Sequence, residues 1–76
     1  MVFPNPADET VWFNSNAVYG DKVELQIFNT IGQQVLCKNW TGPNKDVDIS
    51  LLLKGVYFWT VRVQGKLPVS GKFIKN

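Results

Sequence analysis

Few side chains in this sequence are of types that do chemistry, and they are scattered among apolar residues. The chain has no histidine and a single cysteine, Cys37. Without histidine, neither the serines nor this cysteine has the commonest general base to activate it as a nucleophile. A lone cysteine also excludes an internal disulfide bond and a zinc site built from cysteines. We therefore expect no catalytic residue, no metal site and no cofactor, and the chain is not predicted to be an enzyme.

Three local features have both a chemical and a structural interpretation. Asp46 and Asp48 share a strand face, as carboxylates that hold calcium or exchange protons can do, but no further oxygen ligands lie nearby in the sequence. Exposed polar positions are therefore the preferred interpretation. Cys37 lies in a strand-like segment and is interpreted as a small buried or half-buried apolar residue. Asn39-Trp40-Thr41 matches a glycosylation sequon, a pattern that also occurs by chance.

Size and composition indicate one small globular domain over residues 1–76. Hydrophobic residues make up 45% of the chain and charged residues 18%, a balance typical of folded rather than disordered proteins. No apolar run approaches the roughly 20 residues that span a bilayer. Residues 1–20 contain no basic segment followed by the apolar stretch of a secretory signal. The net charge of +2 is too small to indicate nucleic-acid binding.

Charge is unevenly distributed along the sequence. All six acidic residues lie at or before Asp48, and the three lysines of this part leave it at −3. The part after Asp48 has five basic and no acidic residues, which gives +5. Two interpretations remain open: the strand faces of the second part are basic and solvated, or a basic tail binds a partner or an acidic surface.

Short apolar and alternating runs, separated by turn residues about every 8–12 positions, predict an all-β sandwich or barrel. The expected strands are residues 2–4, 10–13, 22–28, 33–38, 46–49, 56–63 and 67–74. Residues 29–32 are predicted to form a hairpin turn, with Gly32 supplying a positive φ. Residues 50–53 are predicted to form one helical turn with Ser50 as its N-cap. Pro68 indicates that the last strand lies at a sheet edge.

Alternation also predicts which side chains face the core. The positions predicted to point inward are Val11, Phe13, Val23, Leu25, Ile27, Tyr57, Trp59, Val61, Val63, Leu67, Val69 and Phe73. Lys72 and Ile74 are predicted to point outward. Three aromatic residues, Trp12, Phe28 and Phe58, also fall on outward faces. They either pack under loops or against neighbouring strands, or form an exposed platform for sugar or protein binding.

Four separated segments, in this order and at these spacings, carry a resemblance to a known family. They are Pro4-Asn5-Pro6-Ala7, then Val23-Glu24-Leu25 with Ile31-Gly32-Gln33-Gln34-Val35, then Leu53-Lys54-Gly55-Val56-Tyr57-Phe58, and finally Gly71-Lys72-Phe73-Ile74-Lys75-Asn76. Together they resemble the type A C-terminal sorting domain of the type IX (Por) secretion system of Bacteroidetes, over residues 2–76. The sequence departs from the usual pattern at Ile31, Trp59 and Pro68, none of which touches the core of the motifs.

The resemblance implies an immunoglobulin-like antiparallel β-sandwich of about seven short strands, at the C-terminus of a larger secreted protein. Such a domain is a non-catalytic signal that directs its cargo protein from the periplasm across the outer membrane, for attachment to the cell surface or release. The implied partners are the type IX outer-membrane machinery, its sortase and an N-terminal cargo domain, with no nucleic acid and no membrane span.

The resemblance also assigns residues. Sorting and recognition are expected at Lys72, Phe73, Ile74 and Lys75, and mainly structural roles at Pro4, Asn5, Pro6, Gly32, Gly55, Tyr57 and Gly71. The prolines are expected to stiffen the junction with the cargo, and Gly55 to let the chain turn so that Tyr57 enters the core. For the tail, direct recognition and structural completion of the sheet both remain open. The alternative function is an immunoglobulin- or fibronectin-like accessory domain of a secreted enzyme that binds carbohydrate or protein.

Overall fold

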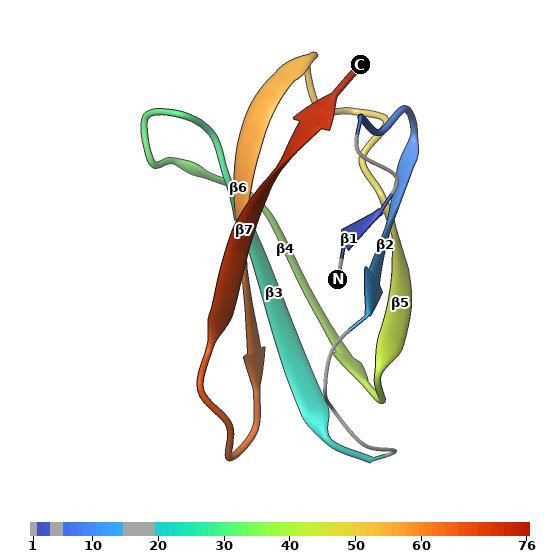
Figure 1. Ribbon diagram of the computed structural model, residues 1–76, viewed down its shortest axis with the longest axis vertical. Helices are drawn as coiled ribbons and strands as arrows, with labels where there is room; N and C mark the ends of the chain where they lie inside the picture. Colours follow the sequence, from blue (N-terminus) through green and yellow to red (C-terminus); the bar gives the residue numbers. More distant parts are fainter. Residues whose placement is uncertain (1, 4–5, 15–19) are drawn as a thin grey trace.

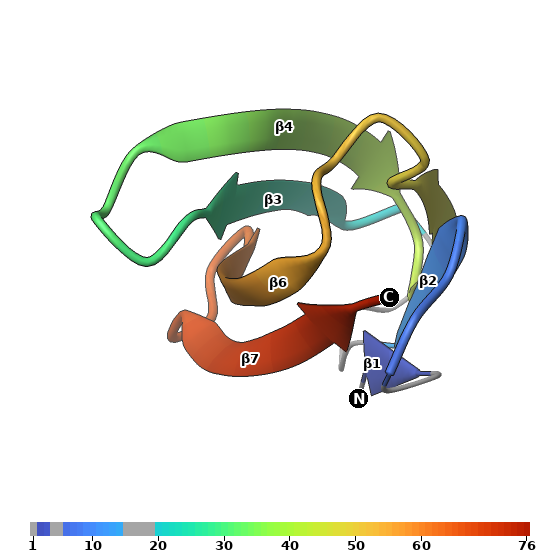
Figure 2. The ribbon, with the colours of Figure 1, turned by 90° about the horizontal axis from the view of Figure 1, so that it is seen from above.

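Two antiparallel β-sheets face each other across an apolar core in the computed structural model of the chain (Figures 1 and 2). The structure describes residues 2–3, 6–14 and 20–76. The strands in these ranges are β1 (Val2–Phe3), β2 (Thr10–Asn14), β3 (Lys22–Phe28), β4 (Gln34–Thr41), β5 (Asn44–Asp48), β6 (Gly55–Val63) and β7 (Val69–Lys75). No helix occurs among the described residues.

The smaller sheet has the order β1-β2-β5 and the larger sheet the order β4-β3-β6-β7, with every ladder antiparallel. Figure 2 shows the two sheets as separate layers. This arrangement confirms the predicted immunoglobulin-like sandwich, and each expected strand is present, β3 with the predicted bounds and the others with shifted ends. The edge position of β7 confirms the prediction made from Pro68, which lies just before the strand.

The core is built by alternation along β2, β3 and β6, as the sequence predicted. The buried apolar side chains are Ala7, Val11, Phe13, Val23, Leu25, Ile27, Val47, Ile49, Tyr57, Trp59, Val61, Val63 and Phe73. Phe13 of the smaller sheet meets Trp59 of the larger one edge to face, with ring centroids 5.7 Å apart and an angle of 83°. This contact joins the two layers in an arrangement that aromatic rings favour.

The inward position predicted for Leu67 is wrong, because this side chain is 87% exposed, and Val69 points toward the core side but is still 53% exposed. Leu67 lies in the connection before β7 begins. Val69 has the same parity as Phe73 and therefore points to the same side of the sheet, but only Phe73 is covered there. Alternation predicts the side to which a residue points, and coverage depends on how far the opposite sheet extends.

The helical turn predicted for residues 50–53 is also wrong. Here the chain makes a turn closed by a hydrogen bond from the Leu52 N–H to the Ile49 carbonyl, 3.0 Å long. The Asp48 carboxylate accepts a hydrogen bond from the Ser50 N–H at 2.8 Å. A side chain that bonds the main chain two residues later favours a turn over a helix, and here Asp48 rather than Ser50 supplies that side chain.

The turn between β3 and β4 confirms the hairpin prediction. Gly32 has a φ of +87° and donates its N–H to the Asn29 carbonyl at 3.1 Å. The Asn29 side chain accepts hydrogen bonds from the N–H groups of Ile31 and Gln33, at 3.1 and 2.9 Å. Asparagine bonded to its own turn and glycine with positive φ are the residues such a turn requires. The ladder also shifts register between Ile27 and Phe28.

Candidate functional site

The side chains that could take part in catalysis or metal binding are dispersed over the fold. Within the described ranges, no group of three or more histidine, cysteine, aspartate or glutamate residues could hold a metal ion. Asp46 and Asp48 are exposed on β5, as the sequence interpretation had it. Cys37 is exposed, so its predicted burial is wrong. It lies opposite Gln26 on the outer side of the edge strand β4, where nothing in the described ranges covers it.

The segment predicted for recognition forms most of β7, and it is divided between the two faces of the sheet. Phe73 is fully buried and Lys75 is 9% exposed, while Ile74 is 45% exposed and Lys72 lies on the surface. The outward orientation predicted for Lys72 and Ile74 is therefore confirmed. Of the four expected recognition residues, only these two can touch a partner without opening the core.

Phe73 is held in the core by Tyr57 of the neighbouring strand. The two residues are paired in the β6–β7 ladder, and their rings stack with centroids 5.7 Å apart at 22°. The Tyr57 hydroxyl donates a hydrogen bond to the Leu53 carbonyl at 2.6 Å. Gly55, between them, has a φ of +149°, which favours glycine. This geometry agrees with the structural roles expected for Gly55 and Tyr57.

The end of β7 pairs with the segment before β2. Ala7 donates its N–H to the Ile74 carbonyl and accepts a hydrogen bond from the Asn76 N–H, both at 2.7 Å. The Asn76 side chain reaches Asp8 at 3.1 Å. Ala7 is fully buried beneath this bridge, and the Lys75 ammonium donates to the Asn76 main-chain oxygen at 2.9 Å. The tail therefore completes the fold, whatever else it does.

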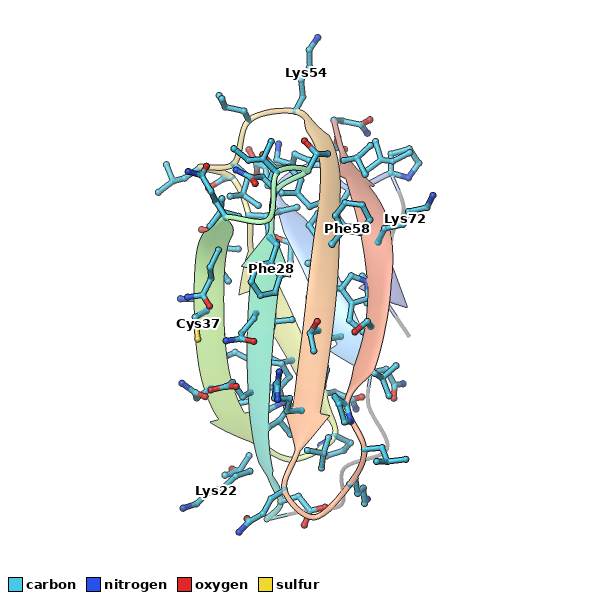
Figure 3. The ribbon with its side chains drawn as sticks, turned by 90° about the vertical axis from the view of Figure 1, so that its left-hand side faces the viewer. Lys22, Phe28, Cys37, Lys54, Phe58 and Lys72 are labelled. Carbon is cyan, nitrogen blue, oxygen red and sulfur yellow. The ribbon has the colours of Figure 1, made fainter. Side chains whose placement is uncertain are left out.

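Three strands bring apolar side chains together on the outer face of the larger sheet. The ladders place Phe28 opposite Phe58, Phe58 opposite Lys72, and Val56 opposite Ile74. Val56, Phe58 and Ile74 are 40%, 44% and 45% exposed, and Phe28 is half-buried. We call these four apolar residues the outer patch. Figure 3 shows Phe28 and Phe58 on this face, with Lys72 beside them.

The charges on this face differ between its two ends. Toward the end opposite the patch, Arg62 lies 3.9 Å from Glu24, and Lys66 lies 3.6 Å from Asp21. Beside the patch, Lys72 has no ion-pair partner among the described residues. Lys54, two residues before Val56, has none in the described part either, and its side chain extends from the end of the molecule in Figure 3. The outer patch is therefore bordered by positive charge that the described residues do not neutralise.

The smaller sheet has a different outer face. Trp12 is 45% exposed there and lies opposite Asp46 in the β2–β5 ladder. A small open hollow of about 210 Å³ is lined by Trp12, Phe13, Asn14 and Asn44. The outward prediction for Trp12 is thus confirmed, and this face combines one aromatic ring with an acidic neighbour.

Of the remaining family residues, the structure describes two and leaves two outside its described ranges. Gly71 lies opposite Trp59 in the ladder, with the indole packed over it. Pro6 is exposed. Pro4 and Asn5 lie outside the described residues, so the expected stiffening of the cargo junction stays a prediction.

These features define a small β-sandwich that presents shaped surfaces and no assembled catalytic group in its described part. Comparison with protein-family models matches residues 1–76 to the family described as "Secretion system C-terminal sorting domain". The chain belongs to this family, whose members are C-terminal sorting signals of type IX secretion. A search of curated proteins gave no match, and a search of solved structures gave none either.

Family membership implies a cargo protein, the type IX machinery and secretion across the outer membrane to the cell surface or the medium. The family is one of sorting signals rather than of catalysts. None of the described residues forms a helix long and apolar enough to cross a membrane.

Sequence reasoning did not find the outer patch as a unit. The alternation placed Phe28, Phe58 and Ile74 outward one at a time, but their adjacency depends on ladder register. Register cannot be read from one strand alone, because sliding a partner by two residues preserves every inward and outward position. The pairing of Ala7 with the end of β7 was missed for a similar reason, since it joins segments nearly a chain length apart.

Proposed function

We propose that this domain directs a folded cargo protein from the periplasm across the outer membrane through the type IX secretion system, for surface attachment or release. The family match over residues 1–76 is the observation that carries the proposal. The fold supports it, because a self-contained β-sandwich whose tail is held by hydrogen bonds can present the same surface to the export machinery on different cargo proteins.

We further propose that the export machinery reads the tail through Lys72 and Ile74, while Phe73 and Lys75 hold those two in position. The division of β7 between a buried and an exposed face supports this assignment. An exposed apolar side chain beside a lysine on an edge strand is suited to docking by another protein. Phe73 and Lys75 then contribute to recognition indirectly, through the geometry of the strand.

A reporter fusion tests the function. Residues 1–76 are joined to the C-terminus of a periplasmic reporter in a host that has this secretion system, and surface display is measured. Wild-type fusion reporter is expected at the surface or in the medium, and a reporter that stays in the periplasm would overturn the function.

The same fusion tests the tail. Lys72→Glu combined with Ile74→Ser should strongly reduce display without lowering the melting temperature of the purified domain. Lys45→Glu, on the exposed face of β5, is the matched charge-reversal control and should export normally. If the wild type and the double variant are displayed equally, the function stands and the tail assignment is wrong.

The proposed partner set includes a surface sortase that removes the domain from its cargo. Its action is tested by determining the mass of the reporter recovered from the cell surface. Loss of the domain from the exported reporter is expected, and an intact fusion at the surface would argue against removal.

The exposed Trp12 favours one second candidate, an accessory domain that binds carbohydrate. An exposed aromatic ring beside polar groups is a common platform for sugars, and Trp12 borders the small hollow of the smaller sheet. A glycan-binding screen of the purified domain decides this. Saturable binding that Trp12→Ala abolishes would support the carbohydrate function, and no binding in the screen would remove it.

A further inference from the structure

We propose that the outer patch, together with Lys72 and Lys54, is the docking surface for a protein segment that presents apolar side chains next to carboxylates. This proposal rests on the proposed export function, and it adds where on the domain the partner binds and what chemistry that partner has. The surface extends beyond the tail, because half of its apolar residues come from β6 and one from β3.

The patch is continuous across three strands. Phe28 pairs with Phe58 between β3 and β6, and Val56 pairs with Ile74 between β6 and β7. Residues directly opposite in adjacent strands have their β-carbons about 4.5–5.5 Å apart, so their side chains are neighbours on the same face. Phe58 and Val56 are two positions apart on one strand and lie on the same face. The four side chains therefore form one surface and not four isolated apolar residues.

Polar side chains elsewhere on the same face of the sheet interact with one another. Gln26 donates to Gln34 at 3.1 Å, the Thr60 and Ser70 hydroxyls are 3.1 Å apart, and Arg62 lies near Glu24. Below the patch the face is thus polar and internally bonded. The four side chains of the patch are apolar instead, and an apolar surface bordered by polar residues is the usual mark of an interaction site.

The charges select the chemistry of the partner. Lys72 is directly opposite Phe58, and Lys54 lies just before β6, close along the chain to Val56. No acidic residue belongs to the patch, and neither lysine has an ion-pair partner in the described part of the chain. Complementary charge steers association and excludes wrong partners. A carboxylate-bearing partner gains from both lysines, whereas a basic one is repelled.

Two other occupants are less suited to this surface. Binding to an anionic membrane through charge typically uses clusters of about 4–8 basic residues, and this patch has only Lys54 and Lys72 beside it among the described residues. A second copy, docked by two-fold symmetry through the same patch, would bring like charges together. An acidic protein segment meets neither objection.

The strands that carry the patch are anchored on their inner side. Phe58 and Val56 flank Tyr57, which is stacked on Phe73 in the core, and the end of β7 is held by Ala7. A surface that is already ordered loses little conformational entropy when a partner binds. Figure 3 shows Phe58 and Lys72 on the adjacent strands β6 and β7.

The test uses the reporter fusion and compares two exposed aromatic residues on opposite faces. Phe58→Ser removes the centre of the patch, and Trp12→Ser removes a side chain of nearly equal exposure, 45% against 44%, from the other sheet. Surface display of Phe58→Ser should fall about tenfold or more, the loss expected for a central interface residue. Trp12→Ser should stay within about twofold of wild type. Both purified variants must retain the wild-type melting temperature within a few degrees.

Charge reversal provides the second arm. Lys54→Glu with Lys72→Glu should reduce display at least as much as Phe58→Ser, while Lys54→Arg with Lys72→Arg should preserve it. Loss of display in the arginine variant as well would contradict a charge-based contact. If Phe58→Ser is folded and displayed like the wild type, the patch is not the docking surface although the export function stands. Failure of the wild-type fusion itself would remove the function and this inference together.

The purified wild-type domain tests the other occupants directly. We expect no co-sedimentation with phosphatidylglycerol–phosphatidylcholine vesicles, and a monomer by analytical ultracentrifugation. Vesicle binding that Phe58→Ser abolishes would reassign the patch to a lipid surface. A dimer that Phe58→Ser dissociates would reassign it to a second copy of the chain. Either result overturns the acidic protein partner.

Discussion

The indole of Trp59 occupies the space that a side chain at Gly71 would need. The two residues are paired in the β6–β7 ladder, and a β-carbon added at Gly71 would lie 2.5 Å from Cζ2 and 2.8 Å from Cε2 of the ring. Gly71 is needed here for the close approach of its neighbour, whereas Gly32 is needed for its positive φ. The Trp59 ring also meets Phe13 of β2 edge to face, so it connects Gly71 of β7 with the smaller sheet.

Gly71→Ala is therefore expected to destabilise the domain. The new methyl group must displace an indole that is packed on its other side, and overpacking of this kind costs about 1–3 kcal/mol of unfolding free energy. Urea denaturation followed by tryptophan fluorescence measures the loss. Trp59→Val should relieve the clash, so a double-mutant cycle is expected to show the alanine costing far less in that background. Equal costs in both backgrounds would show that the ring is not the cause.

Tyr57→Phe isolates the hydrogen bond between the Tyr57 hydroxyl and the Leu53 carbonyl. The ring and its stacking on Phe73 remain, so we expect a loss of about 0.5–1.5 kcal/mol in unfolding free energy, measured by thermal and chemical denaturation. Tyr57→Leu removes the stacking as well and should cost more. A phenylalanine variant as stable as the wild type would mean that water replaces the bond without loss.

Alternation within single strands predicted most of the core and an all-β sandwich or barrel, and the family resemblance then indicated the sandwich. Val23, Leu25 and Ile27 illustrate this, since each is buried as expected. Val69 shows the limit, because its direction was predicted correctly and its exposure was not. The candidate site was predictable only in part. Lys72 and Ile74 were placed outward from β7 alone, whereas their contact with β6 residues required the register.

Asp48→Asn should reveal a pH-dependent contribution to stability. The hydrogen bond from the Ser50 main-chain N–H, with the Ser50 hydroxyl and the nearby Lys38 charge, lowers the pKa of Asp48 below its ordinary 3.8. A carboxyl group whose folded pKa is depressed stabilises the fold above its unfolded pKa, and this contribution is lost as the pH falls through the folded value.

The stability difference between wild type and Asp48→Asn should thus be largest near neutral pH and shrink below about pH 4. Denaturation curves from about pH 7 to about pH 2 measure it. Asp46→Asn removes the same charge from the same strand face and controls for net charge. A difference that stays constant over this range would contradict the assignment.

Phe73→Leu distinguishes a role of Phe73 in core packing from direct recognition of its ring by the export machinery. A swap between apolar side chains of similar size usually costs less than about 1.5 kcal/mol, so the domain should stay folded with Lys72 and Ile74 still exposed. If Phe73 acts only through the core, surface display of the reporter fusion should match that of the wild type. Phe73→Ala, expected to lose about 3–5 kcal/mol, shows the effect of unfolding for comparison. A folded leucine variant with abolished display would instead mean that the aromatic ring is recognised itself.

The bridge between Ala7 and the end of β7 predicts that the main-chain amides there are protected from hydrogen exchange. The Asn76 N–H donates to the Ala7 carbonyl, and the Ala7 N–H to the Ile74 carbonyl, both at 2.7 Å. Both amides should therefore exchange slowly with deuterium, although terminal residues normally exchange fast.

Asp8→Ala removes only the side-chain contact with Asn76 and should leave the Ala7 amide protected. Ala7→Pro removes the buried donor, and it should free the end of β7 and expose Lys75. Rapid exchange of both amides in the wild type would show that the bridge does not persist in solution, and that the tail is more accessible than this structure makes it.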